Sequence, residues 1–249
     1  MTKKLQIVMP MAGAGSRFVN AGFNTPKPLV QVDNIPMFLK AISSLENIKT
    51  QKKYIFVLRQ EHIKTQNLDK LIRKSLPEAI IVTVPEITRG ATETALMAKN
   101  YLEINDPVII MDCDLWFKSE GYEIMVNSVL NGDNSISAGL LTFEATNPRY
   151  SYAKINPNNT VSEVAEKKVI SNHAITGAYF FTSANTFINT ANTLLSRGID
   201  DKTPEYFISL LYNIMIDEGK KIQATYVDEY ASFGTPEELE TYNKTKKLL

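Results

Sequence analysis

The sequence predicts an α/β fold in which helices cover both faces of a mixed, mostly parallel sheet. Two observations indicate this fold. Short apolar segments recur along the first half of the chain, and segments with helical spacing of apolar residues separate them. Strands that alternate with helices favour parallel pairing, because each helix carries the chain back across the sheet.

The first half contains four expected strands and three expected helices. The strands are the short apolar runs at residues 5–10, 53–58, 79–84 and 107–111. The helices place apolar side chains three or four residues apart, at residues 36–45, 62–76 and 92–102. Sheets of this kind bind ligands at the carboxyl ends of their strands. Three polar or glycine-rich segments follow expected strands, at residues 12–17, 88–92 and 112–114.

The second half is less regular. Its expected strands cover residues 135–143, 152–155, 160–164, 174–181 and 222–227. Its expected helices cover residues 187–195, 204–218 and 236–249. Thr235 and Glu238 form a capping-box pattern that predicts the start of the last helix. Because the sequence shows no repeat, low-complexity segment or linker, it predicts one domain over residues 1–249.

Composition excludes several classes of protein. The 27 basic and 27 acidic side chains cancel, so no overall charge favours nucleic acid or an anionic membrane. No apolar segment is long enough to predict a membrane span. The single cysteine, Cys113, cannot form an intramolecular disulfide, which fits a reducing, cytoplasmic location. With two histidines and one cysteine, a structural zinc cluster is not expected.

The segment from Met9 to Val30 carries the strongest functional pattern. Gly13 and Gly15 lack side chains, so backbone N–H groups there can approach phosphate oxygens closely. Arg17 adds a fork of donors, and two flanking prolines hold Lys27 on a stiff segment. We therefore expect a phosphate-binding loop whose backbone contacts come from Ala12, Gly13, Ala14 and Gly15.

Two common phosphate-binding motifs do not fit this loop. A dinucleotide fingerprint needs a third glycine where the chain has Phe18. A Walker A loop needs Gly-Lys-Ser/Thr after its glycines, and the chain has Ser16-Arg17 instead. A dinucleotide-dependent oxidoreductase is therefore disfavoured.

The pattern G-x-G-S-R followed by P-K-P-L after a first strand resembles the signature of the sugar-phosphate nucleotidyltransferase family. The resemblance extends over about residues 5–239 in four ordered blocks. It implies a Rossmann-like, GT-A-like nucleotidyltransferase fold and a requirement for Mg²⁺. It also implies that Arg17 and Lys27 contact the triphosphate and support attack on its α-phosphorus.

Asp112 and Asp114 follow the fourth expected strand. Two carboxylates at a spacing of two residues can meet a hard cation that is bound to phosphate oxygens. The resemblance implies that Asp114 binds Mg²⁺ and that Asp112 supports it or serves as a further ligand. A solvated turn is the alternative interpretation of the same residues.

One departure from the family pattern concerns the metal. The family usually has a second aspartate two residues before a late Gly-Thr, and the chain has Ser232 there. A hydroxyl is a far poorer Mg²⁺ ligand than a carboxylate. Three explanations stay open: Asp112 completes the site, Asp228 or Glu229 reaches it, or the nucleotide itself holds most of the metal.

Two further blocks are expected to bind the base and the acceptor. Residues 86–96 resemble the family's base pocket, with Thr88, Gly90, Ala91 and Thr92 as nucleotide-binding candidates. Thr92 is equally well explained as a helix N-cap. The segment around Glu166, Lys167 and Gly177 resembles the acceptor block. The resemblance implies that Glu166 binds hydroxyls or amines of the acceptor and that Lys167 binds its phosphate. Lys167 is also expected to act in catalysis. The alternative is that Glu166 and Lys167 form an ordinary exposed ion pair.

These observations predict an enzyme that transfers a nucleoside monophosphate to a small phosphorylated acceptor and releases pyrophosphate. The short chain resembles the small cytidylyltransferases of this family more than the larger thymidylyltransferases, which implies CTP as donor and a role in capsule or surface-glycan synthesis. Residues of about 1–135 would bind the nucleotide, and residues of about 136–235 the acceptor. The alternatives are a GT-A-type glycosyltransferase, which also uses Asp-x-Asp, and a non-catalytic nucleotide-binding module. The sequence leaves open the acceptor and the formation of a homo-oligomer.

Overall fold

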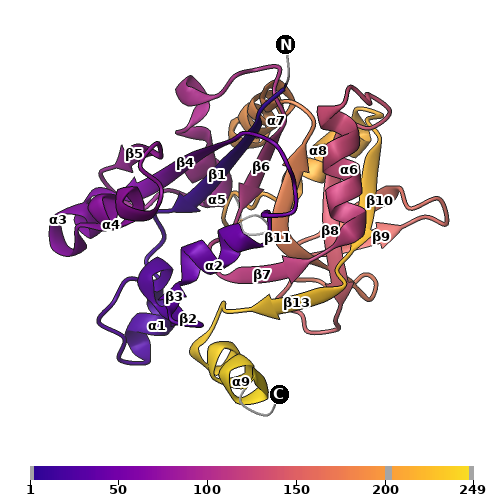
Figure 1. Cartoon of the computed structure of the whole chain (residues 1–249). Helices are drawn as coiled ribbons and strands as arrows, with labels where there is room; N and C mark the ends of the chain where they lie inside the picture. Colours follow the sequence, from indigo (N-terminus) through magenta and orange to yellow (C-terminus); the bar gives the residue numbers. More distant parts are fainter. Residues whose placement is uncertain (1–2, 200–203, 247–249) are drawn as a thin grey trace.

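The computed structural model describes residues 3–199 and 204–246 and is built on one nine-stranded mixed sheet (Figure 1). Seven strands follow the order β10-β9-β11-β6-β1-β4-β5, while β8 pairs with β11 and β12 pairs with β8. The strands are β1 (Leu5–Met11), β4 (Lys52–Arg59), β5 (Ile80–Val84), β6 (Val108–Met111), β8 (Ala138–Glu144), β9 (Tyr152–Ile155), β10 (Val161–Ala165), β11 (His173–Phe181) and β12 (Ile222–Tyr226).

Two short antiparallel pairs lie outside this sheet. They are β2 (Gln31–Val32) with β3 (Ile35–Pro36), and β7 (Leu115–Lys118) with β13 (Glu229–Ser232). The α-helices are α1 (Ser16–Asn20), α2 (Met37–Ser43), α3 (Gln60–Gln66), α4 (Leu68–Ser75), α5 (Ala91–Leu96), α6 (Glu120–Leu130), α7 (Ala184–Arg197), α8 (Leu210–Asp217) and α9 (Pro236–Lys246). Two single-turn 3₁₀ helices are η1 (Lys27–Leu29) and η2 (Lys99–Tyr101).

The pairing confirms the predicted fold class. Strand β1 lies between β4 and β6 and is parallel to both, and β5 is parallel to β4. Strand β11 is antiparallel to β6, and this pairing continues the sheet from the first half of the chain into the second. The carboxyl ends of β1, β4 and β6 therefore meet at one edge, as parallel strands require.

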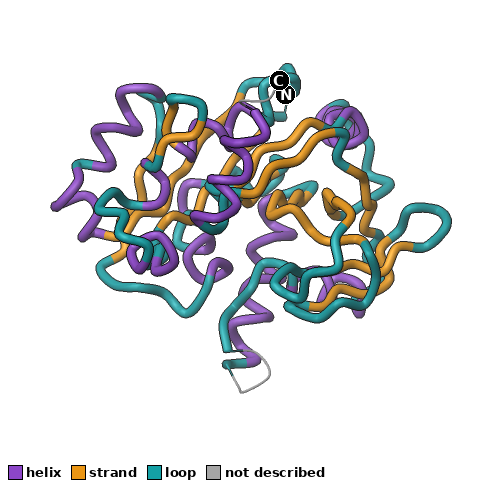
Figure 2. Tube along the Cα trace, turned by 90° about the horizontal axis from the view of Figure 1, so that it is seen from below, coloured by secondary structure: helices purple, strands orange, loops and turns teal. Residues whose placement is uncertain are grey.

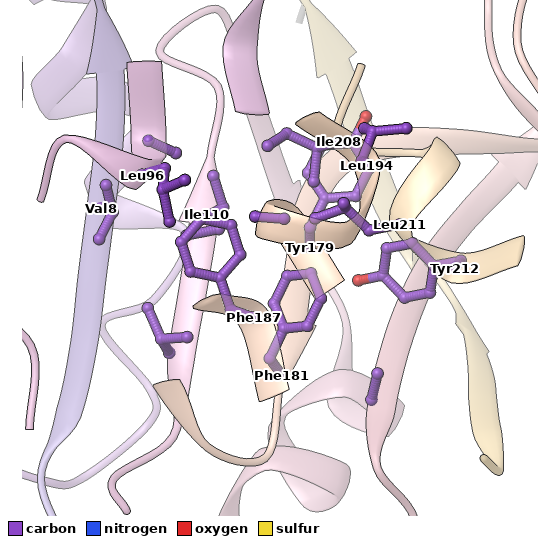
Figure 3. Close-up of a cluster of buried hydrophobic side chains, with 14 of the residues drawn as sticks. Val8, Leu96, Ile110, Tyr179, Phe181, Phe187, Leu194, Ile208, Leu211 and Tyr212 are labelled. Atoms are coloured by element: carbon purple, nitrogen blue, oxygen red, sulfur yellow. The ribbon is translucent and has the colours of Figure 1, made fainter. Parts of the chain in front are cut away.

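Strands β1, β6, β8 and β11 are buried along nearly their whole length, which explains why their sequences are mostly apolar. On one face Val8, Ile110 and Tyr179 pack against α7 and α8 (Figure 3). On the other face Ile7, Ile109 and neighbouring side chains pack against α2, α4 and α6. Each fully buried aliphatic or aromatic side chain contributes about 1.5–3 kcal/mol. Figure 2 shows the resulting arrangement, with the strands between two groups of helices.

Several expected elements differ from the structure. The expected helix at residues 62–76 is two helices, because Asn67 adopts a left-handed conformation with φ 50° and ends α3. The expected helix at 204–218 begins only at Leu210. Residues 200–203 and 247–249 lie outside the described residues, so the end of the last expected helix is not tested beyond Lys246. The β7–β13 pair was not expected, because each strand is short and its partner is remote in sequence.

A third apolar cluster fastens the C-terminal helix beside the predicted phosphate loop. Its buried members include Phe18 of α1, Leu239 of α9, and Phe233, which precedes α9. The predicted capping box is confirmed: the Thr235 hydroxyl accepts from the Glu238 N–H at 3.2 Å, and the Glu238 carboxylate accepts from the Thr235 N–H at 3.0 Å. Figure 1 shows α9 below the sheet, next to β13 and near β2 and β3.

Asp33, at the β2–β3 turn, adds polar contacts to this docking. Its carboxylate accepts from the Tyr242 hydroxyl at 2.7 Å and pairs with Lys40 at 2.9 Å and Lys246 at 2.7 Å. These contacts join the turn to both α2 and α9. The β2–β3 turn, α2 and α9 are thereby held together. Among the described residues, no helix is long and apolar enough to cross a membrane.

We predict that Asp33→Asn destabilises the fold at neutral pH. Burial opposes the charge on this carboxyl, but Lys246, Lys40 and Tyr242 hold its pKa at about 2, below its ordinary 3.8. Because the folded pKa is the lower one, the stabilisation is complete above pH 3.8 and is lost as the pH falls towards 2. Urea unfolding should give a lower free energy of unfolding for the variant than for the wild type at pH 7, and this difference should shrink as the pH falls from 3.8 towards 2.

The matched control for this measurement is Asp217→Asn, at an exposed residue on the last turn of α8. It removes the same charge without touching α9. A loss of stability with the same pH dependence in this control would contradict a specific role for Asp33.

Candidate active site

Three cavities lie around the loops that follow β1, β4, β5 and β6. The first, here called the loop cavity, has a volume of about 430 Å³ and includes Gly13, Lys27, Asp112 and Asp114 in its wall. The second, the Gly90 cavity, has about 600 Å³ and lies between the β1 loop and residues 87–94. The third, the Glu166 cavity, has about 220 Å³. A fourth and larger cavity, of about 1110 Å³, lies at the amino ends of β1 and β4, and none of the predicted site residues lines it.

The three cavities adjoin one another through shared residues. Gly13, Ala14 and Gly15 line both the loop cavity and the Gly90 cavity. Asp112 and Asp114 line both the loop cavity and the Glu166 cavity. Segments that are far apart in the sequence therefore form one continuous site at the edge where the parallel strands end.

Lys27 and Asp114 form an ion pair between the β1 loop and the β6 loop. The 3₁₀ turn η1 starts at Lys27 and follows Pro26, whose extended conformation directs the chain back over the sheet. Burial opposes the charge on Lys27, but the neighbouring carboxylates, Asp114 first, raise its pKa above the ordinary value. The ammonium group therefore stays charged and available to phosphate oxygens.

Asp112 is the buried member of the carboxylate pair. Burial and the adjacent charge of Asp114 raise its pKa to about 7, although Lys27 opposes this rise. Its backbone N–H donates to the Gly177 carbonyl at 3.0 Å, which holds the β6 loop against β11. Gly177 has φ 96°, and a Cβ there would lie 2.5 Å from a carboxylate oxygen of Asp112. The glycine is needed because its missing side chain leaves room for this carboxylate.

The residues beside Asp114 fit a metal that arrives with a nucleotide. A Cβ on Gly234 would lie 3.3 Å from an Asp114 oxygen, 3.6 Å from the Ser232 hydroxyl and 3.1 Å from a Glu238 oxygen, so the missing side chain keeps open a space lined by oxygen atoms. Among the described residues, no group of three or more His, Cys, Asp or Glu side chains is placed to hold a metal alone. Mg²⁺ usually binds one or two protein carboxylates and takes its other ligands from phosphates and water.

One of the three explanations for the serine at position 232, that Asp228 or Glu229 reaches the metal, loses support. Glu229 pairs with Lys118 at 2.6 Å, and Asp228 accepts from the Glu120 N–H at 2.8 Å. Neither residue lines the Glu166 cavity. The second carboxylate near Asp114 is that of Glu238, whose side chain also pairs with Arg149 and accepts from the Tyr150 hydroxyl.

Glu166 is positioned by two hydroxyl groups. The Ser151 hydroxyl and the Ser209 hydroxyl, the latter at 2.6 Å, both donate to one of its carboxylate oxygens. Glu166 lines the Glu166 cavity with Gly177, as the sequence predicted for a shared acceptor site. Lys167 does not line it: this lysine is exposed, has φ 52°, and places its Nζ 4.5 Å from the centre of the Phe207 ring, which does line the cavity.

Two arginines supply positive charge to the Glu166 cavity. Arg17 is exposed and lines this cavity rather than the loop cavity. Arg149 pairs with Glu238 and stacks 4.6 Å from the centre of the Tyr150 ring. Tyr152, by contrast, is fully buried and donates to the Asn147 carbonyl at 2.7 Å, so it belongs to the scaffold. His173 contacts the Tyr226 hydroxyl at 3.1 Å, away from the three cavities.

The Gly90 cavity contains most of the predicted base-binding residues. Thr88, Gly90 and Ala91 line it together with Thr94, whose hydroxyl bonds that of Thr88. Thr92 is fully buried and lies outside the lining, and Gly90 rather than Thr92 is the cap of α5. A Cβ on Gly90 would lie 2.5 Å from the Tyr206 nitrogen, so only glycine lets these two backbone segments pair.

Sequence reasoning missed several residues of the site. Arg149, Ser151 and Ser209 lie on loops or at element ends without a recognisable motif. Glu238 was predicted only as part of a capping box, His62 only as the first residue of a helix, and Arg59 lay just outside the strand predicted at residues 53–58. The tertiary fold alone brings these residues to the cavities.

Comparison with known proteins identifies the class to which this site belongs. The family model described as nucleotidyl transferase matches residues 6–241. The chain belongs to the nucleotidyl transferase family. No curated protein matches the chain.

Two solved structures share the fold of this nucleotidyltransferase. One is the nucleoside-diphosphate-sugar pyrophosphorylase from Vibrio cholerae RC9, at 22% identity, with a TM-score of 0.80 over 96% of this chain and 99% of that one. The other is the inositol-1-phosphate CTP transferase from T. maritima, at 16% identity, with a TM-score of 0.74 over 99% of this chain and 96% of that one. The family assignment decides against the glycosyltransferase alternative and supports an enzyme.

We predict that Gly177→Ala destabilises the nucleotidyltransferase far more than Gly132→Ala. Both glycines have positive φ, 96° and 102°, so both alanines carry similar backbone strain of about 1–3 kcal/mol. Only at Gly177 does the new methyl group meet Asp112, while at Gly132 nothing lies within 4 Å. Urea unfolding should therefore separate the two variants, and equal losses of stability would show that the contact with Asp112 does not matter.

Proposed function

We propose that the enzyme transfers a nucleoside monophosphate, CMP from CTP, to a small phosphorylated acceptor and releases pyrophosphate. The observation that supports this most directly is the sharing of Asp112 and Asp114 by the loop cavity and the Glu166 cavity. A triphosphate in the first cavity and an acceptor in the second would meet at these carboxylates. The family assignment supplies the reaction class.

The triphosphate would lie along the β1 loop. Gly13, Ala14 and Gly15 line both the loop cavity and the Gly90 cavity, and their backbone N–H groups would bind the phosphates next to the base. Ala12 is buried and holds the start of the loop. Thr88, Gly90 and Ala91 would contact the base and ribose.

Charge stabilisation would come from residues around the α-phosphorus. Lys27 on one side and Arg17 on the other would bind phosphate oxygens as negative charge develops. Asp114, with Asp112 beside it, would hold Mg²⁺, which neutralises phosphate charge when bound. No protein nucleophile is required, because the acceptor phosphate is itself an anionic nucleophile. The enzyme's main contribution is then to orient two anions in line.

The acceptor would occupy the Glu166 cavity. Glu166, fixed by Ser151 and Ser209, can accept hydrogen bonds from a hydroxyl or amine of the acceptor. Lys167 lies at the rim, where its flexible side chain would bind the acceptor phosphate after a rotamer change. These features are compatible with a sugar 1-phosphate, a polyol phosphate, phosphocholine or a phosphorylated amino acid or amide.

Two finer parts of the proposal concern the donor and the biological role. CTP is proposed as the donor, and one fold neighbour is named as an inositol-1-phosphate CTP transferase. Nucleotide-linked products of this type feed capsule and surface-glycan synthesis, and a nucleoside triphosphate donor fits a cytoplasmic reaction. One domain, with a nucleotide half before about residue 135 and an acceptor half after it, suits this arrangement.

We expect pyrophosphate release with Mg²⁺, one of CTP, dTTP, UTP, GTP or ATP, and one acceptor from a pool of phosphorylated sugars, polyols, choline and amino acids. Lys27→Ala should lower kcat by roughly 100-fold or more, because one charge-stabilising donor at a transition state is worth about that much. Lys74→Ala, at an exposed lysine of α4, serves as the control and should leave the rate unchanged. Nucleotide binding without release for any pair would instead indicate a binding module.

A second expectation concerns the metal. Ser232→Asp adds a carboxylate next to Asp114 and should lower the Mg²⁺ concentration that gives half-maximal rate, whereas Ser232→Asn should not. The measurement is initial rate against free Mg²⁺, together with Mg²⁺ binding followed by calorimetry. An unchanged Mg²⁺ requirement in Ser232→Asp would show that position 232 does not contribute to metal binding.

A further inference from the structure

Arg59 and His62 lie in the wall of the loop cavity, where the reaction described above assigns them no role. Arg59 ends β4, and His62 is in the first turn of α3. Both line the cavity together with Gly13, Lys27 and Glu61, and Glu61, which is largely exposed, pairs with Arg59 at 3.0 Å. Their position follows from strand register: Leu58 pairs with Met11, so Arg59 comes directly beside the start of the β1 loop.

The hydrogen bond between these two side chains determines where His62 carries its proton. Arg59 Nη2 lies 2.9 Å from His62 Nε2, and a guanidinium group can only donate. His62 Nε2 is therefore the acceptor, and Nδ1 carries the hydrogen. Burial, followed by the charge of Arg59, lowers the pKa of His62, so the ring is neutral and keeps this single N–H.

Two donors of this pair have no acceptor. Arg59 Nε and His62 Nδ1 are both buried and lack a hydrogen-bond partner among the described residues. His62 is 8% exposed, and the Arg59 side chain is 13% exposed. Buried donors without partners are uncommon, because each loses its bonds to water without replacement. Two such donors on a pair of contacting side chains that line one cavity indicate a site for a ligand that brings acceptor oxygens.

The residues that line the loop cavity indicate which ligand these donors would bind. The loop cavity is lined by the β1 loop and Lys27, whose N–H and ammonium groups suit phosphate oxygens. The carboxylates of Glu61, Asp112 and Asp114 also line it, so a phosphate bound here would need a cation beside them. Glu166, Tyr150 and Ser151, which face the acceptor, do not line this cavity. The phosphate groups that lie here are thus the ones that leave rather than the ones that join the acceptor.

We propose that Arg59 and His62 bind the β- and γ-phosphates of the donor and hold the pyrophosphate leaving group. This inference rests on the proposed function. In the reaction, an oxygen of the acceptor phosphate bonds to the α-phosphorus, and the bond from that phosphorus to the bridging oxygen of the β-phosphate breaks. Pyrophosphate leaves with the bonding electron pair. Arg59 Nε and His62 Nδ1 are covered in this structure and would donate to its oxygens after the two side chains shift towards the cavity.

The test measures binding of inorganic pyrophosphate to the full-length protein by titration calorimetry, without donor or acceptor. Arg59→Gln and His62→Phe should each weaken binding roughly tenfold to a hundredfold, as expected for the loss of a hydrogen bond to a charged group. His62→Asn places an amide near the Nδ1 position and should stay within about threefold of the wild type. Arg73→Gln, at an exposed arginine of α4, is the control for loss of charge and should bind normally.

A nuclear magnetic resonance readout separates contact from a structural effect. The chain has only two histidines, so the ring ¹⁵N–¹H signals of His62 are assigned by comparison with His62→Phe. Pyrophosphate should shift the Nδ1 proton of His62 and leave the ring signals of His173 unchanged. CMP, which lacks the β- and γ-phosphates, should bind the wild type and Arg59→Gln with equal affinity.

Three outcomes would overturn the proposal: no pyrophosphate binding by the wild type, equal binding by Arg59→Gln, or an equal loss of CMP affinity in that variant. The pyrophosphate binding test can succeed or fail independently of the proposed function. If turnover is absent but the pyrophosphate results hold, the anion site stands and the transfer reaction fails. If turnover is present and pyrophosphate binding is unaffected by either substitution, only the role of Arg59 and His62 fails.

Discussion

The ion pair between Lys27 and Asp114 connects loops that are 87 residues apart, and the candidate site is organised around it. Asp112 is half-buried beside this pair, where burial and the charge of Asp114 raise its pKa to about 7 against the opposing effect of Lys27, and Gly177 leaves room for its carboxyl group. A buried carboxylate pair without a cation would be strongly destabilising. When substrates bind, phosphate groups could therefore replace Asp114 as the partner of Lys27, and a metal ion could replace Lys27 as the partner of the carboxylates.

The scaffold places this pair by satisfying a different requirement, the burial of apolar surface. Strands β1 and β6 are covered on both faces, by α5, α7 and α8 on one side and by α2, α4 and α6 on the other. Both faces must be apolar along the strands, so polar residues are confined to the loops beyond the strand ends. The concentration of candidate residues at one edge of the sheet follows from this confinement and from parallel pairing.

The C-terminal helix contributes to the site from outside the sheet. Its capping box presents Glu238 to Arg149 and to the space beside Asp114, while Leu239 and Tyr242 pack against the cluster that contains Phe18. The carboxylate of Glu238 thus serves helix capping and the electrostatics of the Glu166 cavity at the same time. Because α9 also contacts Asp33 through Tyr242, the docking of the helix and the position of the β1 loop depend on one another.

The sequence alone determined the α/β class, the central strands and the phosphate loop, because apolar periodicity and a contiguous glycine and proline motif are local properties. It also placed Asp112, Asp114, Glu166 and Gly177 in the candidate site, through ordered motifs. Only the tertiary structure decided that Thr92 is buried, that α3 ends at Asn67, and that Glu238 rather than Asp228 or Glu229 lies near Asp114. It likewise brought Arg59 and His62 to the loop cavity. These outcomes depend on which strands are neighbours and on how α9 docks, and contacts between residues so far apart leave no local pattern in the chain.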